Sequence, residues 1–341
     1  MLNLKVNINI NNAGGLIMSI LVTGGAGYIG SHVIKDLNNN DFDVITLDNL
    51  KKGHKKAVTC GKFIKGDISD KNLLNKIFTE NNIDAVIHLA ADSLVGESME
   101  NPGKYYHNNF NKGIILLDQM KKHDVKNIVF SSTAAVYGEP NEVPIRENHH
   151  ISPGNTYGES KYFFEKAMDR YDKIFDLKYM SLRYFNAAGA DPSGEIGEEH
   201  DPETHLIPLV LDTAMGKRDK LYIFGTDYET RDGTCVRDYI HVNDLAKAHT
   251  LALRALLDGK DSSIYNLGNG EGYTVKEVIE TARKVTNKSI PAKNSERRIG
   301  DPAVLIASST KIKEELNWKA DYPELESIIE TAWNWHQKGG F

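Results

Sequence analysis

Tyr157 and Lys161 stand four residues apart in NTYGESKYFFEKAM, residues 155–168, and their side chains could move a proton. If this segment is an amphipathic helix, residues at that spacing share one face. A phenol has a pKa of about 10 and is a poor base at neutral pH. A neighbouring ammonium lowers that pKa because it favours the phenolate. The pair therefore predicts a general acid–base site.

The same spacing occurs a second time, at Tyr162 and Lys166. Two tyrosines five residues apart point about 140° apart around a helix axis, so only one of them can face a cofactor. Tyr157 is nearer the expected helix start, whereas Phe163 and Phe164 surround Tyr162 with packing residues. We therefore predict that Tyr157 is the reacting phenol.

A third reacting group is expected from FSSTAAVYG, residues 130–138, where a predicted strand ends. This segment supplies the hydroxyls of Ser131, Ser132 and Thr133. One of them could bridge a substrate oxygen and the phenol of Tyr157. The alternative is a hydroxyl that only caps the strand end, and for Ser131 this alternative is favoured.

A glycine-rich turn predicts the cofactor that such a site would use. SILVTGGAGYIGSHV, residues 19–33, places Gly24, Gly27 and Gly30 between a predicted strand and a predicted helix. In a dinucleotide-binding turn the first glycine permits the tight turn, the second lets the backbone approach a pyrophosphate, and the third lets the helix pack on the strand. The phosphates then lie at the helix N-terminus, where backbone N–H groups favour an anion.

An acidic residue at the end of the next strand strengthens the glycine signal. The carboxylate of Asp48 could bind both hydroxyls of an adenosine ribose and would repel a 2′-phosphate, so the sequence predicts NAD over NADP. Lys51 and Lys52 could attract such a phosphate, but a solvated basic loop is the favoured interpretation of these two lysines. Asp67 follows the third strand, where it could hold adenine.

The elements that must position these residues alternate between short β-rich runs and longer amphipathic runs. The expected strands span residues 19–24, 43–48, 62–67, 84–91 and 127–132, and the expected helices span residues 31–40, 72–81 and 102–123. Strands and helices in turn predict a parallel sheet with helices on both faces. The predicted fold is therefore α/β, a Rossmann-like doubly wound parallel sheet with a smaller mixed α/β substrate domain.

The composition of the sequence changes at residue 186, where the Gly-, Pro- and acid-rich segment NAAGADPSGEIGEEHDPETHL predicts a loop. We predict a dinucleotide-binding domain over 18–185 and a mainly substrate-binding domain over 186–341, whose segments could return to the first domain. Residues 1–17 are Asn-rich and are interpreted as a poorly ordered extension ahead of a natural start at Met18. The alternative for this extension is an extra edge strand.

Composition excludes several classes of protein. The net charge of −6 does not favour binding to nucleic acid or to anionic lipid, since both are negatively charged. The two cysteines cannot build a disulfide framework and fit a reducing compartment, so we expect a cytoplasmic protein. A membrane span needs about 20 consecutive apolar residues, and none is expected here. No metal site is predicted.

Several motifs together resemble a known family. They are TGGAGYIGSH, DNL, GDI, HLAA, VGES, FSSTAAVYG, YGESK, LRYFNAAGA, GTCVRDYIHV, YNLG and RRIGDPA. In their order and spacing they are similar to the extended short-chain dehydrogenase/reductase superfamily and, within it, to the UDP-glucose 4-epimerases. The resemblance runs from about Ser19 to Trp335.

The resemblance implies reversible 4-epimerisation of UDP-galactose and UDP-glucose with tightly bound NAD. The Tyr157 phenolate would take the proton of the sugar 4-hydroxyl while C4 gives a hydride to NAD, and the 4-keto sugar would turn over before the hydride returns. Thr133 would be the hydroxyl partner, and Lys161 would support the phenolate. The resemblance also implies a homodimer built from the helices near 102–123 and 155–174.

The site residues expected from the motifs fall into two sets. The cofactor set is Gly24, Gly27, Tyr28, Ile29, Gly30, Asp48, Asn49, Asp67, Ile68, Leu89, Ala90, Ala91, Asn108, Ser131, Ser132, Tyr157, Lys161 and Tyr184. The substrate set, which the resemblance implies, is Ser93, Thr133, Tyr157, Asn186, Leu206, Arg237, Arg298 and Asp301. Ser93 stands where some relatives have a lysine that touches the cofactor, so this contact is absent or replaced.

Other activities on the same fold fit these residues to different degrees. A nucleotide-sugar 4,6-dehydratase would carry Asp-Glu after the hydroxyl residue, where this chain has Ala134 and Ala135. A 4-epimerase of UDP-N-acetylglucosamine, UDP-glucuronic acid or UDP-xylose stays open, since Leu305 is neither bulky nor small at a position that governs sugar size in the family. A non-catalytic NAD-binding regulator is disfavoured because Tyr157 and Lys161 are both present.

Overall fold

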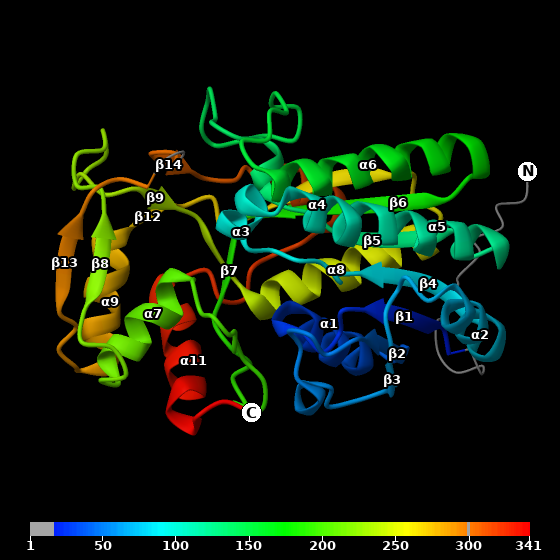
Figure 1. Ribbon diagram of the computed structural model, residues 1–341, viewed down its shortest axis with the longest axis horizontal. Helices are drawn as coiled ribbons and strands as arrows, with labels where there is room; N and C mark the ends of the chain where they lie inside the picture. The colour runs from blue at the N-terminus through cyan, green and yellow to red at the C-terminus, as the bar shows by residue number, and fades with distance from the viewer. Residues whose placement is uncertain (1–16, 299–300) are drawn as a thin grey trace, which may run out of the picture.

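A computed structural model describes residues 17–298 and 301–341 (Figure 1). Most of the predicted extension, residues 1–16, therefore lies outside the described residues, as do residues 299 and 300 of the RRIGDPA motif. None of the helices in the described ranges is long and apolar enough to cross a membrane.

A seven-stranded parallel sheet is the centre of the described chain, with strand order β11-β6-β5-β4-β1-β2-β3. Its strands are β1 (Ser19–Thr23), β2 (Asp43–Asp48), β3 (Lys62–Lys65), β4 (Ile83–His88), β5 (Asn127–Ser131), β6 (Lys178–Tyr184) and β11 (Ser263–Leu267). The order along the chain reverses between β1 and β4. At such a switch point the loops beyond the carboxyl ends diverge and leave a crevice for a ligand.

Continuous apolar runs make the inner strands because both faces of the sheet are covered. Ile20, Leu21 and Val22 of β1 are completely buried, as expected for a parallel sheet between two helical layers. One layer contains α1 (Tyr28–Asn39), α8 (Val242–Leu257) and α10 (Thr310–Leu316). The other contains α2 (Lys71–Asn81), α5 (Lys112–Lys122) and α6 (Thr156–Phe175), and Figure 1 shows the two layers on opposite sides of the sheet.

The long helix predicted over 102–123 is interrupted. It consists of α4 (Pro102–Tyr105), a π-helical turn (Tyr106–Asn111) and α5. Within the π turn the buried Asn109 accepts a hydrogen bond from the Asp92 N–H and donates to the Asp92 carbonyl, both at 2.9 Å, so its amide is held by the neighbouring loop. Single π turns inside helices are frequent at functional sites, and the adjacent Asn108 lines the cleft described below. A further helix, α3 (Val95–Glu100), precedes α4.

A smaller mixed region lies at the other end of the molecule, on the left of Figure 1. Its strands are β7 (Asn186–Ala188), β8 (Leu221–Phe224), β9 (Val236–Arg237), β10 (Tyr239–His241), β12 (Tyr273–Thr274), β13 (Ala292–Ser295) and β14 (Val304–Leu305). Its helices are α7 (Leu206–Ala214), α9 (Val275–Thr286) and α11 (Leu325–Lys338), which share a separate apolar core.

The chain passes between the two regions more than once. After β10, α8 packs on the face of the sheet that α1 covers, and β11 pairs in parallel with β6 as an edge strand of the sheet. Composition alone predicts a boundary at residue 186, and that boundary stays a prediction. The crossings place residues from both regions along the open end of the sheet.

Candidate active site

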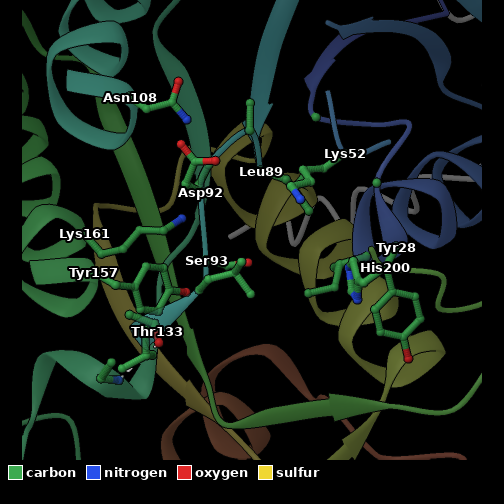
Figure 2. A pocket seen from close by; sticks show the side chains of 18 of the residues that line it. Tyr28, Lys52, Leu89, Asp92, Ser93, Asn108, Thr133, Tyr157, Lys161 and His200 are labelled. Carbon is green, nitrogen blue, oxygen red and sulfur yellow. Dashed lines mark hydrogen bonds between the residues drawn. The ribbon is translucent and has the colours of Figure 1, made fainter. Parts of the chain in front are cut away.

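A cleft of about 930 Å³ opens at the carboxyl ends of the sheet strands, between the two regions (Figure 2). Most of the predicted site residues line it. They are Gly24, Gly27, Tyr28, Ile29, Gly30, Asp48, Asn49, Asp67, Ile68, Leu89, Ala90, Ala91, Ser93, Asn108, Thr133, Tyr157, Lys161, Tyr184, Asn186 and Asp301. Leu305 lies on the same wall.

Five predicted residues do not lie on the cleft wall: Ser131, Ser132, Leu206, Arg237 and Arg298. The Ser131 hydroxyl is hydrogen-bonded to buried His249, and the Ser132 hydroxyl donates to Glu165 at 2.5 Å. Leu206 starts α7 and packs against the core of the smaller region. These three side chains are therefore used in packing and internal hydrogen bonds.

The two predicted arginines have protein partners. A guanidinium nitrogen of Arg237 lies 2.5 Å from Asp301, which does line the cleft. Arg298 is exposed, and its guanidinium carbon lies 4.2 Å from the ring centre of Phe224. Neither arginine is among the described residues that line the cleft.

The glycine turn has the geometry of an anion cradle. Gly24 has φ +78°, and a Cβ there would lie 2.6 Å from the backbone nitrogen of Ala90, so only glycine fits. α1 begins at Tyr28, three residues earlier than the periodicity predicts, and no described side chain caps its N-terminus. The first N–H groups of α1 are thus open to the cleft and suit a phosphate.

Asp48 and Asp67 add two carboxylates to the lining of the cleft. Asp48 accepts hydrogen bonds from the N–H groups of Ala26 at 3.0 Å and Leu50 at 2.8 Å, although burial raises its pKa. Asp67 accepts from Asn49 and from Lys112, at 2.8 and 2.9 Å. Hydrogen bonds, including those from Ser69 and Lys112, hold the pKa of Asp67 well below its usual range against the opposing effect of burial.

The phenol and the ammonium that were predicted to react lie side by side on the other wall (Figure 2). Asn155 caps α6 by accepting the Gly158 N–H at 2.8 Å, which places Tyr157 in the first turn. Tyr157 and Lys161 are 8% and 3% exposed, so water has little access to either group. Burial lowers the pKa of Lys161 to about 7. Burial also raises the pKa of Tyr157, and its hydrogen bond to Thr133 acts in the opposite direction.

A chain of hydrogen bonds through Ser131 and His249 holds the Lys161 side chain in place. Its Nζ donates to the Ser131 carbonyl at 2.8 Å, and the Ser131 hydroxyl lies 2.8 Å from Nε2 of His249. Because Nδ1 of His249 faces the Leu245 carbonyl at 2.8 Å, it must carry the proton, and Nε2 accepts from Ser131. Burial lowers the pKa of His249 to about 4 and keeps the ring neutral. The ammonium is therefore anchored to β5 and, through it, to α8.

Tyr162 and Lys166, the second tyrosine–lysine pair with this spacing, have a different environment. Tyr162 packs against the small apolar cluster of Val136, Tyr137 and Ile145, and Lys166 is exposed. Tyr162 and Lys166 are not among the described residues that line the cleft.

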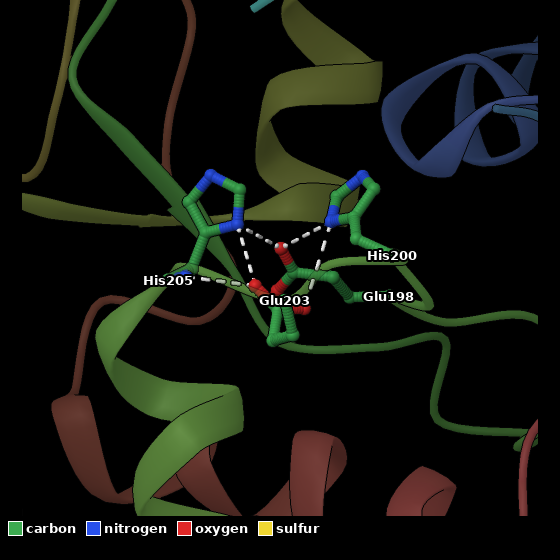
Figure 3. A group of neighbouring side chains, drawn as sticks. All are labelled: Glu198, His200, Glu203 and His205. Carbon is green, nitrogen blue, oxygen red and sulfur yellow. Dashed lines mark hydrogen bonds and ion pairs between the residues drawn. The ribbon is translucent and has the colours of Figure 1, made fainter. Parts of the chain in front are cut away.

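Sequence reasoning missed a group of four side chains, three of which, Glu198, His200 and His205, line the cleft. Glu198, His200, Glu203 and His205 come from the loop between β7 and α7, and their polar atoms converge (Figure 3). The carboxylates raise the pKa of His200 to about 9 and that of His205 to about 10, against the effect of burial. The spacing Glu-x-His-x-x-Glu-x-His is the signal that could have revealed them.

Comparison with known proteins places these features in a family. The NAD dependent epimerase/dehydratase family matches residues 20–268. The UDP-glucose 4-epimerase of Halalkalibacterium halodurans is 56% identical over 321 residues, which cover 94% of this chain and 96% of that protein.

Solved structures agree in fold over a similar length. A crystal structure of UDP-glucose 4-epimerase superposes with a TM-score of 0.93 at 53% identity, covering 95% of this chain and 99% of that chain. The UDP-glucose 4-epimerase of Brucella ovis in complex with NAD superposes with a TM-score of 0.91 at 44% identity, covering 93% and 97%.

Proposed function

Because this chain belongs to the NAD dependent epimerase/dehydratase family, we propose how its residues carry out the reversible 4-epimerisation of UDP-galactose and UDP-glucose. The activity rests above all on one observation, the similarity to UDP-glucose 4-epimerase at 56% identity along 94% of the chain. The residue roles rest on the cleft, whose lining includes the buried Tyr157 and Lys161 together with the glycine turn.

The residues at the glycine turn suit NAD. The open N-terminus of α1 and the bare backbone of Gly24 and Gly27 would hold the pyrophosphate. The Asp48 carboxylate would bind the adenosine ribose, and Asp67 with Asn49 would flank the adenine. When bound, NAD supplies a hydride acceptor and donor for C4 of the sugar.

Tyr157 is the proposed acid–base for the proton of the sugar 4-hydroxyl. Its phenol is buried, so a proton it takes is not exchanged readily with bulk water. Burial alone raises its pKa, and a positive charge in the same cleft acts in the opposite direction. Thr133 holds the phenol by a hydrogen bond, and Lys161 adds a proton donor fixed on β5.

Asn186 and Asp301 are the proposed contacts to the UDP end, since both line the cleft from the smaller region. Arg237 is paired with Asp301. If Asp301 bound the substrate instead, the Arg237 guanidinium would be free to bind the diphosphate, since a guanidinium can bond two phosphate oxygens at once. Arg298 and Leu206 would reach the substrate only after a local shift of the loop or of α7.

We also propose a homodimer through the outer face of α6 and the neighbouring π turn. Phe163 is 39% exposed on this face and Ile174 is 66% exposed. The Phe163 ring stacks on Tyr106 at 6.0 Å between ring centres and meets Phe110 edge-on. Exposed aromatic and aliphatic side chains on one helical face are typical of an interface between subunits.

The activity is tested by incubating the purified protein with UDP-galactose and measuring UDP-glucose, with UDP-N-acetylgalactosamine in parallel. Clear conversion of UDP-galactose is expected. Conversion of the N-acetylated sugar alone would instead assign the site, with Leu305 on its wall, to the larger substrate. Conversion of neither sugar would contradict the proposal.

A further inference from the structure

The group Glu198, His200, Glu203 and His205 has four ligand atoms within 4.8 Å of one another. Nδ1 of His205 lies 2.9 Å from a carboxylate oxygen of Glu198 and 2.9 Å from one of Glu203. Nδ1 of His200 lies 3.2 Å from Glu198 and 3.6 Å from Glu203. Figure 3 shows both imidazoles turning the same ring nitrogen toward the two carboxylates.

Hydrogen bonds within this group do not satisfy all of its polar atoms. A ring nitrogen carries at most one proton, yet Nδ1 of His205 faces two carboxylate oxygens at equal distance. Nδ1 of His200 is buried and has no hydrogen-bond partner among the described residues, despite its short distance from Glu198. A buried polar atom without a partner is unfavourable and calls for an explanation.

One cation at the centre would satisfy all four ligand atoms. Zn²⁺ binds imidazole nitrogen and carboxylate oxygen at about 2.0–2.2 Å in a tetrahedron, which separates neighbouring ligand atoms by about 3.4 Å. The two ring nitrogens lie 2.9 and 3.2 Å from the same oxygen of Glu198, and 2.9 and 3.6 Å from the two different oxygens of Glu203, so these distances lie on both sides of that value. Two imidazoles also favour Zn²⁺ over Mg²⁺ and Ca²⁺, which prefer oxygen ligands.

We propose that Glu198, His200, Glu203 and His205 bind one Zn²⁺ ion. Four protein ligands leave no open position, so the ion has a structural role.

The surroundings of the group indicate what the ion would stabilise. His205 directly precedes α7, and the Glu198 carbonyl accepts from the indole of Trp335 on α11 at 2.9 Å. On the other side, the His200 ring packs edge-on against Tyr28 of α1, with ring centres 6.2 Å apart. The ion would therefore join the smaller region to the helix that starts at the glycine turn, and would stiffen the wall of the cofactor cleft.

The test uses the full chain without a histidine tag, treated with a chelator and desalted. ZnSO4 alone is then titrated, and bound metal and the thermal midpoint are measured. One Zn²⁺ per chain is expected after dialysis, with a rise of roughly 5 °C in Tm at saturating metal. The variant His205→Asn should lose the Tm rise. Because losing even an outer-shell partner lowers metal affinity about 10–100-fold, its Zn²⁺ affinity should fall at least about 100-fold.

His150→Asn is the matched control because His150 is exposed and lies outside the group. It should keep the metal stoichiometry and the Tm rise of the unmodified chain. His200→Asn gives a second measurement if the His205 variant fails to fold. Substoichiometric zinc, no effect of zinc on Tm, or equal losses in the control would overturn the proposal, leaving only an ion-paired cluster. An equal response to MgCl2 would overturn the choice of Zn²⁺.

Discussion

At the scale of single residues, Tyr157 and Tyr162 are each followed by a lysine four residues later, but only Tyr157 is among the described residues that line the cleft. Tyr157 is in the first turn of α6, beside the buried Lys161 and hydrogen-bonded to Thr133. Tyr162 packs in an apolar cluster, and its partner Lys166 is exposed. A lysine whose pKa burial lowers to about 7 can change its charge near neutral pH, whereas an exposed ammonium stays solvated.

We therefore expect Tyr157→Phe to lose nearly all turnover of UDP-galactose while it still retains NAD. The substitution removes the oxygen proposed to exchange a proton with the sugar 4-hydroxyl, and it leaves the glycine turn and Asp48 intact. Turnover and the bound cofactor of the purified variant are measured separately. Tyr162→Phe is the matched control and should stay active. The opposite result for the two variants would assign the reaction to Tyr162.

At the scale of elements, a buried ion pair joins α6 to the sheet. Arg183 on β6 lies 2.5 Å from Glu165 on α6, and both side chains are 3% exposed. The same carboxylate accepts the Ser132 hydroxyl, and Arg183 also donates to the Tyr137 hydroxyl at 2.9 Å. This pair holds the helix that carries Tyr157 at the end of β5.

Glu165→Gln should lower the free energy of unfolding by about 3–5 kcal/mol, because it leaves the Arg183 charge buried without a counter-charge. Urea unfolding measures the change. Asp169→Asn on the same helix removes a solvent-facing pair with Lys173, in which the lysine side chain is 60% exposed, and should change stability by about 0.5 kcal/mol or less. Similar effects of the two substitutions would show that Glu165–Arg183 is not a buried pair in solution.

His249 on α8 predicts a pH dependence of stability. In the unfolded chain an imidazole binds a proton below about pH 6.5, whereas burial keeps the folded His249 neutral down to a pKa of about 4. The unfolded state therefore binds more protons between these values, and acid favours unfolding by about 1.4 kcal/mol per pH unit for this group.

His249→Gln should remove this contribution. The stability of the variant, followed by urea unfolding between about pH 6.5 and 4, should fall less steeply than that of the unmodified protein by about 1.4 kcal/mol per pH unit. His150→Asn changes an exposed ring and should keep the original slope. Equal slopes for all three proteins would mean that His249 is not held neutral in the folded state.

At the scale of the whole molecule, two regions meet at one cleft, and the outer surface of α6 bears apolar side chains. The chain crosses between the regions, since α8 covers the sheet and β11 is its edge strand, although both follow β7 and α7. The cleft is thus built from segments far apart in the sequence. Phe163 and Ile174 are the exposed apolar side chains of α6, which covers one side of the sheet (Figure 1).

Phe163→Asp should convert the proposed dimer into a monomer, because it places a charge in an apolar interface. Light scattering coupled to size exclusion measures the mass. Tyr222→Asp is the control, since Tyr222 is 41% exposed on β8 in the smaller region and should leave the dimer intact. A monomeric unmodified protein, or a Phe163 variant that stays dimeric, would contradict the proposed interface.

The sequence alone determined the local features of this protein. Apolar runs predicted β1, β2 and β5 to within one residue at each end, and the glycine spacing predicted the turn before α1. The four-residue spacing of Tyr157 and Lys161 fixed their common helical face. These features depend on neighbours along the chain, which periodicity and residue type report directly.

Only the tertiary structure decided which distant groups meet. It joined Ser131 to His249, 118 residues away, and brought Glu198 of the β7–α7 loop within the same cleft as the glycine turn. It also turned Arg237 toward Asp301 and inserted a π turn where one uniform helix was predicted. Such contacts arise when separate elements pack and bury their polar groups together, and no local periodicity records which partner each group will find.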